Sequence, residues 1–161
     1  MNPKSIGTAT ALLLALAAAV SIRVSFGAQG QQLSSAQQAV WNTVVAWNDA
    51  FERNDTDAFF RFIDPEITVI TPGNPFRISG VGPDRQEFEF SLQRGTSRVG
   101  YFQEIDPQIA VYGDVAVVTY YSRGHYGGDA GKTAYYKETD VLVRRDQSWK
   151  IVHIHLSSAA S

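Results

Sequence analysis

Apolar residues recur at helical spacing near the start of the chain and at strand spacing over its second half. A first helix from Ser34 or Ser35 to about Arg53 is predicted by a stripe of apolar positions: Val40, Val44, Trp47 and Phe51. A second, short helix is expected over residues 56–63 behind the cap Asp55. A third is expected over residues 83–93, because proline is favoured at the first position of a helix.

Strands are expected over six further segments: residues 67–71, 76–78, 98–112, 115–126, 132–145 and 149–157. Gly113-Asp114 and residues 127–131 have the composition of hairpin loops, and Asp106-Pro107 is expected to place a bulge or bend in the first long strand. Helices followed by a long meander predict an α+β fold, with three N-terminal helices packed on a curved antiparallel sheet. Such a sheet, wrapped around a helix, encloses a cone-shaped cavity that is open at one end.

The last strand contains two of the three histidines of the chain. Strict alternation along it predicts two faces, each with bulky apolar groups: Trp149, Ile151, His153 and His155 on one, and Lys150, Val152, Ile154 and Leu156 on the other. We therefore expect the two histidines to share a face with the indole of Trp149.

The N-terminus has the layout of a secretory signal peptide. A short basic region ending at Lys4 precedes the apolar run of residues 11–20, and small residues follow near Gly27. Residues 1–27 are thus predicted to be a signal peptide, 28–33 a mobile polar leader, and 34–158 the folded domain. The protein is expected to be exported, periplasmic or secreted, with an uncleaved N-terminal membrane anchor as the alternative.

Charge and cysteine content restrict the classes of partner and chemistry. Cleavage near Gly27 leaves 12 basic residues against 16 acidic ones, a net charge of −4. This argues against nucleic acid, and against an anionic membrane after signal cleavage, as the main partner. The chain has no cysteine, which excludes disulfides, cysteine zinc sites and thiol catalysis.

The order of elements and a set of C-terminal motifs resemble the nuclear transport factor 2-like superfamily, also called the SnoaL-like or cystatin-like roll. Within it, the chain is most similar to the SnoaL-like group that includes the association domain of calcium/calmodulin-dependent kinase II. The resemblance covers residues 34–158. It depends on these residues: Gly113-Asp114-Val115-Ala116, Tyr120, Glu138-Thr139-Asp140-Val141, Arg144-Arg145-Asp146, Trp149, Val152-His153-Ile154-His155 and Ser157.

The resemblance implies a conical roll and a homodimer formed through the outer face of the sheet. In the kinase association domain, arginines project into the pocket from two long strands, and Ser122 and Asp140 occupy the corresponding positions here. Because neither residue is arginine, a site for an anionic ligand is not carried over. The fold itself hosts isomerases, dehydratases, hydrolases, ligand carriers and oligomerisation modules, so it does not select a function.

His153 and His155 are candidate general bases or hydrogen-bond donors, with Asp140 on the adjacent strand as the residue that orients them. The alternative is that both histidines are structural groups at a sheet edge or an interface. The same two histidines, together with His125 and a carboxylate, are the alternative candidates for a metal site. We predict no metal and no cofactor.

Glu138 and Asp140 share a strand face and would raise each other's pKa if they were buried together. Ketosteroid isomerase-like members of this fold use a carboxylate base with a tyrosine as oxyanion donor, and Tyr120 on the neighbouring strand is the candidate for that donor. The alternative is an ordinary cross-strand ion pair between Glu138 and Arg123.

The candidate ligand-binding residues are Trp47, Tyr101, Ser122 and Glu138. We expect Trp47 to line the pocket, because the first helix roofs the cavity in folds of this kind. Tyr101 and Glu104 face opposite ways in a regular strand, so only one of them points inward. The sequence therefore predicts a module that binds a small, partly apolar ligand, mediates homo-oligomerisation, or both. The alternative is a small isomerase, dehydratase or hydrolase using His155 or His153 with Asp140 and Tyr120.

Overall fold

The computed structural model describes residues 32–159, and the predicted signal peptide lies outside them, as does most of the predicted leader. The described part contains three helices, six strands and a short 3₁₀ turn at Gly128–Ala130. The helices and strands follow one another in the order α1 (Ser35–Glu52), α2 (Thr56–Phe60), β1 (Ile63–Ile70), β2 (Ile78–Ser79), α3 (Val81–Gln93), β3 (Val99–Tyr112), β4 (Val115–Tyr126), β5 (Lys132–Arg145) and β6 (Ser148–Ser158).

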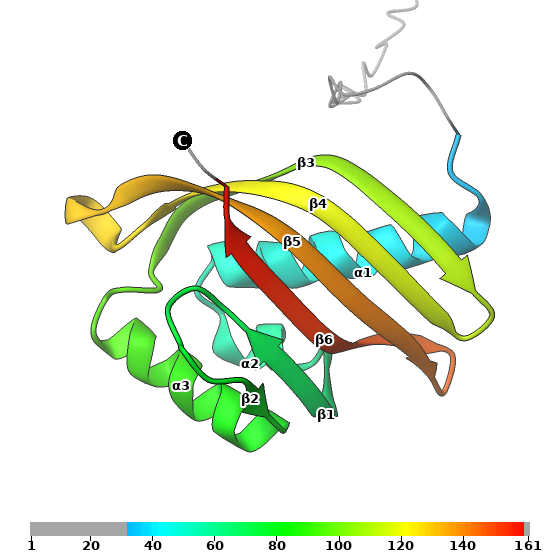
Figure 1. Cartoon of the computed structure of the whole chain (residues 1–161), viewed down its shortest axis with the longest axis horizontal. Helices are drawn as coiled ribbons and strands as arrows, with labels where there is room; N and C mark the ends of the chain where they lie inside the picture. The colour runs from blue at the N-terminus through cyan, green and yellow to red at the C-terminus, as the bar shows by residue number, and fades with distance from the viewer. Residues whose placement is uncertain (1–31, 160–161) are drawn as a thin grey trace, which may run out of the picture.

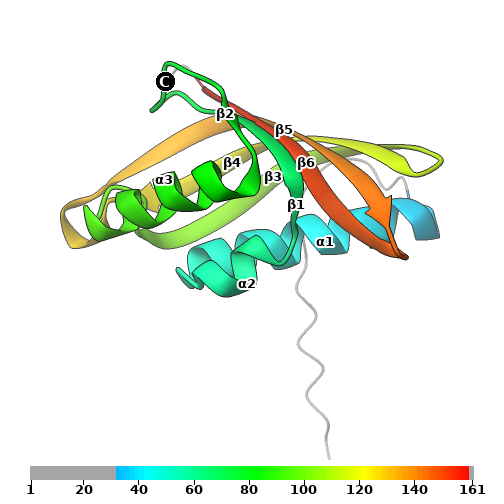
Figure 2. The ribbon, with the colours of Figure 1, turned by 90° about the horizontal axis from the view of Figure 1, so that it is seen from below.

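The six strands form one curved, unclosed sheet in the order β2-β1-β6-β5-β4-β3 (Figure 1). This confirms the predicted α+β class. The expectation of a wholly antiparallel sheet is wrong at one pair, because β1 and β6 run parallel. The chain leaves β1 through β2 and α3, forms the β3–β4–β5 meander, and returns with β6 beside β1. Figure 2 shows α1 along one face of the sheet, and no helix of residues 32–159 covers the opposite face.

Local hydrogen bonds fix both ends of α1. Ser34 and Gln37 form a capping box, in which each side chain accepts a hydrogen bond from the backbone of the other residue. Its buried stripe comprises Val40, Val44, Trp47, Asn48 and Ala50. Beyond its end, Asn54 has a left-handed backbone (φ 53°), and its amide bonds both the N–H and the C=O of Val99. The end of α1 is thereby tied to the start of β3.

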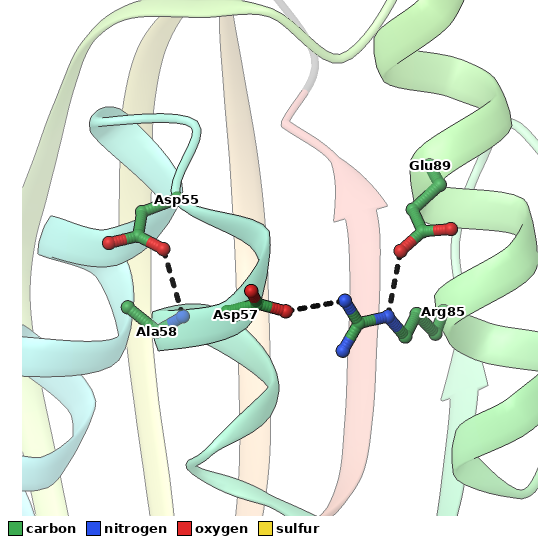
Figure 3. Close-up of polar contacts among 5 residues, drawn as sticks. All are labelled: Asp55, Asp57, Ala58, Arg85 and Glu89. Carbon is green, nitrogen blue, oxygen red and sulfur yellow. Dashed lines mark hydrogen bonds and ion pairs between the residues drawn. The ribbon is translucent and has the colours of Figure 1, made fainter.

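A polar cluster holds the two shorter helices side by side (Figure 3). Asp55 caps α2 by accepting the N–H of Ala58 at 3.0 Å. Arg85 of α3 bonds Asp57 of α2 and Glu89 one turn further along its own helix. Arg85 thereby links α3 to α2, and both helices contribute walls to the pocket described below.

Two of the register shifts in the sheet bear on the predicted faces of its strands. In β3 the register against β4 shifts between Ile105 and Gln108, as the Asp106-Pro107 pair predicted, and Asp106 has φ 52°. In β6 the register against β5 shifts between Ile151 and His153, so that Val152 is the extra residue. This second bulge was not predicted. It reverses the alternation of β6, since a shift of one residue exchanges the two faces.

The predicted face assignment of β6 is therefore wrong beyond Ile151. Trp149 and Ile151 are buried on the inner face, and Ile154 and Leu156 continue that face after the bulge. His153 and His155 pair with Val141 and Thr139 of β5 and lie on the outer face. The predicted sharing of one face between the histidines and Trp149 does not occur.

The core lies between the inner face of the sheet and α1 and α2. Fully buried aliphatic side chains from five elements meet there: Val40, Val44, Ile67, Val118, Leu142 and Ile151. Within residues 32–159, no helix has both the length and the apolar character needed to cross a bilayer.

Candidate functional site

A pocket of about 550 Å³ lies beside this core, between the three helices and the inner face of the sheet. All three helices contribute aromatic walls, through Trp47 and Phe51 of α1, Phe59 of α2 and Phe88 of α3. The sheet contributes Phe102, Tyr126, Tyr136, Glu138, Ile154 and Leu156. A pocket of this volume with mostly apolar walls and a few polar groups is typical of small-molecule sites.

Glu138 is the central polar group of the pocket wall. It is buried on β5, where Tyr120 and Ser122 of β4 each donate a hydroxyl hydrogen bond to one of its carboxylate oxygens. The Tyr120 bond measures 2.6 Å. Burial raises the pKa of Glu138, and the two hydroxyl donors oppose that shift. The alternative ion pair with Arg123 does not form, because Arg123 lies on the outer face over the rings of Tyr101 and Tyr135.

A hydrogen-bonded chain connects Glu138 to α1 and β3. The Asn48 amide donates to the Tyr120 hydroxyl at 3.3 Å and to Glu104 Oε1 at 3.0 Å. Burial raises the pKa of Glu104, opposed in part by the Asn48 hydrogen bond. Tyr120 itself is buried and does not line the pocket. Its hydroxyl is therefore committed to holding Glu138 in place.

Asp140 lies two residues beyond Glu138 on the same inner face and is completely buried. Neither of its carboxylate oxygens has a hydrogen-bond partner among the described residues. Burial, and then the charge of Glu138, hold its pKa well above the ordinary value of 3.8. Asp140 is therefore the member of this carboxyl pair that holds its proton more tightly, because Glu138 accepts two hydroxyl hydrogen bonds and Asp140 accepts none from the described residues.

Two further buried polar groups belong to the pocket wall. Asp84, in the first turn of α3, is 8% exposed, and its Oδ2 has no partner among residues 32–159. Burial raises its pKa to about 6. The indole Nε1 of Trp47 is likewise buried without a partner in the described part. Buried polar atoms without partners are uncommon in folded proteins, so both call for an explanation.

The predicted pairing of His153 or His155 with Asp140 is wrong. Asp140 faces the core opposite Ile154, whereas both histidines lie on the other side of the sheet because of the Val152 bulge. His153 Nδ1 lies 2.7 Å from the hydroxyl of Thr68, and His155 is exposed. Burial, and then His155, lower the pKa of His153.

Of the four predicted ligand-binding residues, Trp47 and Glu138 line the pocket and the other two do not. Tyr101 faces outward and packs against His125, so Glu104 is the inward residue of that pair. Ser122 is buried behind Glu138. Within residues 32–159 no three His, Asp or Glu side chains gather closely enough to hold a metal ion.

Sequence reasoning singled out neither Asp84 nor the full aromatic wall. Asn48 lies next to Trp47 and four residues after Val44 in α1, so its helical spacing was the available signal of its burial. Asp84 follows Pro83 in the first turn of α3, and nothing local marks it as buried. Its burial comes from the packing of α3 against the sheet, which is a tertiary effect.

The outer face of the sheet carries a second candidate surface. Register places Tyr112, Val115, Tyr121 and Tyr135 there, on β3, β4 and β5. All four are exposed, from 40% for Val115 to 69% for Tyr112. Exposed apolar patches of this kind are typical of protein–protein interfaces.

A curved, unclosed sheet with helices over one face and a pocket between them defines a cystatin-like α+β roll. The chain belongs to the SnoaL-like domain family, whose family model matches residues 40–161. It is 26% identical over 137 residues to the calcium/calmodulin-dependent protein kinase type II subunit delta of Oryctolagus cuniculus. That match covers 81% of this chain but 25% of the kinase subunit, so the chain spans about a quarter of the length of that relative.

Solved structures show the same fold. A nuclear transport factor 2-like protein of unknown function from Pseudomonas putida is 16% identical and superposes with a TM-score of 0.70. That match covers 79% of this chain and 89% of the other. The calcium/calmodulin-dependent kinase II hub of S. rosetta is 26% identical, with a TM-score of 0.65 over 80% of this chain and all of the hub.

Proposed function

We propose that this protein binds a small, partly apolar molecule in the pocket between its helices and the inner face of its sheet. The observation that carries the proposal is the composition of the pocket wall. It combines about 550 Å³ of space and aromatic rings from every surrounding layer with the buried carboxyls of Glu138 and Asp84. A core built only for stability would be packed without such a space.

The ligand is expected to have an apolar body and at least one polar group. The aromatic walls favour a ring or a branched alkyl group, since burial of apolar surface provides most of the affinity in such pockets. The polar group is expected to reach Glu138 or Asp84, because Asp84 has a carboxylate oxygen without a partner in the described part.

A titration with the neutral dye Nile red, followed by its fluorescence, tests whether the pocket takes up an apolar molecule. Ser91 of α3 lines the pocket, and Ser91→Trp fills part of it. Thr133→Trp, at an exposed position of β5, is the matched control. We expect the dissociation constant to rise about tenfold in Ser91→Trp and to stay unchanged in Thr133→Trp. Equal binding by both variants would contradict the proposal.

We further propose that the protein forms a homodimer through the outer face of the sheet. The four exposed apolar side chains on β3, β4 and β5 support this, and so does the similarity to the S. rosetta kinase hub. Because the pocket opens on the other side of the sheet, ligand binding and dimer formation do not compete for the same surface.

Sedimentation velocity of Tyr121→Glu tests the dimer. Tyr121 lies on β4 between Ile105 of β3 and Lys137 of β5, and a carboxylate placed there would lose its water on association. We expect a dimer for the wild type and a monomer for Tyr121→Glu. Glu66→Gln, at an exposed position of β1, is the control that is expected to remain a dimer. A wild type that sediments as a monomer at high concentration would contradict it.

The enzyme alternative is retained only in a form that uses Glu138. Glu138 lines the pocket and burial raises its pKa, as suits a general base. Tyr120, the donor that the alternative named, does not line the pocket, so the alternative loses one of its predicted catalytic residues. Binding is therefore the function that we favour.

We also propose that the chain is exported and that residues 1–27 are removed. The support is the sequence pattern alone, and the segment lies outside the described residues. Intact mass of the protein recovered from its native host tests the proposal. Mass loss corresponding to cleavage near Gly27 is expected, and an intact N-terminus in a membrane fraction would favour the anchor instead.

A further inference from the structure

The charged groups of the pocket are almost all of one sign. Glu138, Asp84 and Glu87 line it, whereas Arg94 is the only basic residue among the described residues of the wall. Arg94 is exposed and places its guanidinium 5.4 Å from the centre of the Phe90 ring. The interior of the pocket therefore presents carboxyls without a nearby protein cation.

This arrangement is costly in the empty protein. The ion pairs within residues 32–159 use other carboxylates, namely Asp57, Asp64, Glu89 and Asp114. Glu138 and Asp84 thus have no cationic partner in the described part, although both are more than nine-tenths buried. A buried carboxylate without a counter-charge destabilises a fold. A cation from outside the chain would offset that cost.

The aromatic walls favour the same charge. Phe59 and Phe88 stack at 4.6 Å between ring centres, and Phe51 packs against both Phe102 and Tyr126. Aromatic rings carry a negative potential on their faces and attract cations placed over them. They also accept the hydrocarbon part of an organic cation, which a hydrated metal ion lacks.

We propose that the pocket selects a small organic cation, a protonated amine or quaternary ammonium with an apolar body, whose charge lies against Glu138 or Asp84. The inference rests on the proposed ligand-binding function and specifies the chemical class of the ligand. The two carboxyls come from different walls, Glu138 from β5 and Asp84 from α3, so the charge has two alternative positions within one pocket.

Glu138 is the better held of the two. Its oxygens accept the hydroxyls of Tyr120 and Ser122, which hold the carboxyl group in position and favour its ionised form. The neighbouring Asp140 has no such donors among the described residues, and burial holds its pKa well above the ordinary value. Glu138 therefore provides a carboxyl group that is positioned before any ligand arrives, which reduces the cost of ordering the site on binding.

Three probes of nearly the same shape test the charge preference: 2-naphthylmethylamine, 2-naphthylmethanol and 2-naphthoate. Calorimetric titration of the full chain near neutral pH is expected to give at least about tenfold tighter binding of the amine than of the alcohol. The carboxylate probe is expected to bind most weakly. The preference for the amine should shrink to within about threefold in whichever of Glu138→Gln and Asp84→Asn removes the carboxyl that the charge contacts, and in the double variant. It should persist in Glu66→Gln, which removes an exposed carboxyl outside the pocket.

The possible outcomes separate the two proposals. Equal binding of amine and alcohol, or preference for the carboxylate, overturns the cation inference and leaves the ligand-binding proposal standing. Failure of all three probes, together with Nile red, overturns both. Should Glu138→Gln fail to fold, the comparison of amine with alcohol in the wild type still decides the inference, and Asp84→Asn, which is expected to be more stable than the wild type, shows whether Asp84 contacts the charge.

Discussion

Replacement of Asp84 by asparagine is expected to make the protein more stable at neutral pH. Asp84 is 8% exposed, has an oxygen without a partner among the described residues, and takes part in none of their ion pairs. Asparagine has nearly the same shape and no charge. The substitution therefore removes the cost of burying a carboxylate while it leaves the packing of α3 almost unchanged.

The size and sign of the effect follow from the pKa of Asp84. Burial raises that pKa from 3.8 to about 6, so the folded state binds the proton more tightly than the unfolded chain does. The corresponding stabilisation is complete below pH 3.8 and is lost as the pH rises through about 6. The total is about 3 kcal/mol, of which about 2 kcal/mol disappears between about pH 4.5 and about pH 7.5. The helix dipole favours a negative charge in the first turn, which reduces this loss of stability by up to about 1 kcal/mol.

Urea denaturation of the wild type and Asp84→Asn, at several pH values across that range, measures the effect. The difference in unfolding free energy between the two proteins is expected to grow by about 1–2 kcal/mol in favour of the variant as the pH rises. Comparison of the two unfolding free energies at each pH isolates Asp84, because the other carboxyls titrate in both proteins and their contributions cancel. Glu87→Gln, which removes an exposed carboxyl from the same helix, is the matched control and is expected to show no such trend.

A pH-independent difference between Asp84→Asn and the wild type would refute the reasoning. It would mean that Asp84 is paired or hydrated in solution. A variant that is less stable than the wild type at neutral pH would refute it more strongly, since the charge would then contribute to stability. Loss of amine binding in a stabilised variant would identify Asp84 as a residue kept for function at a cost in stability.

Further substitutions test the remaining parts of the structure. Tyr120→Phe removes the hydroxyl between Asn48 and Glu138 and is expected to cost about 1–3 kcal/mol in urea denaturation, whereas Tyr112→Phe, at an exposed ring, should cost almost nothing. Leu142→Ala, at a fully buried core position, should cost about 2–5 kcal/mol by the same measurement. His153→Gln should reduce the loss of thermal stability below about pH 6.5. Burial lowers the pKa of His153, so its contribution is complete above the ordinary value of 6.5 and is lost as the pH falls; an unchanged pH profile would contradict this.

Local signals predicted those parts of the fold that depend on local interactions. Ser34 and Asp55 cap their helices as expected, and Gly113 turns between β3 and β4 with φ 62°. The bounds of β4 and β5 agree with the prediction because glycine-containing turns flank β4 on both sides, and the polar turn Asp146-Gln147 ends β5. The parallel β1–β6 pair could not be predicted in this way, since it joins segments more than eighty residues apart. Asp84 escaped notice for a related reason, because only the docking of α3 buries it.

Val152 shows why the candidate chemistry was harder to predict than the fold. Val152 is β-branched and typical of a regular strand, so it does not predict a bulge, whereas the Asp106-Pro107 pair does. Yet this one extra residue moves His153 and His155 to the outer face and keeps Ile154 and Leu156 on the pocket wall. Without it, two imidazoles would face Asp140 and the carboxyl network inside the pocket. The bulge thus separates the titratable groups of the sheet, with carboxyls on the ligand side and histidines on the side proposed for the dimer.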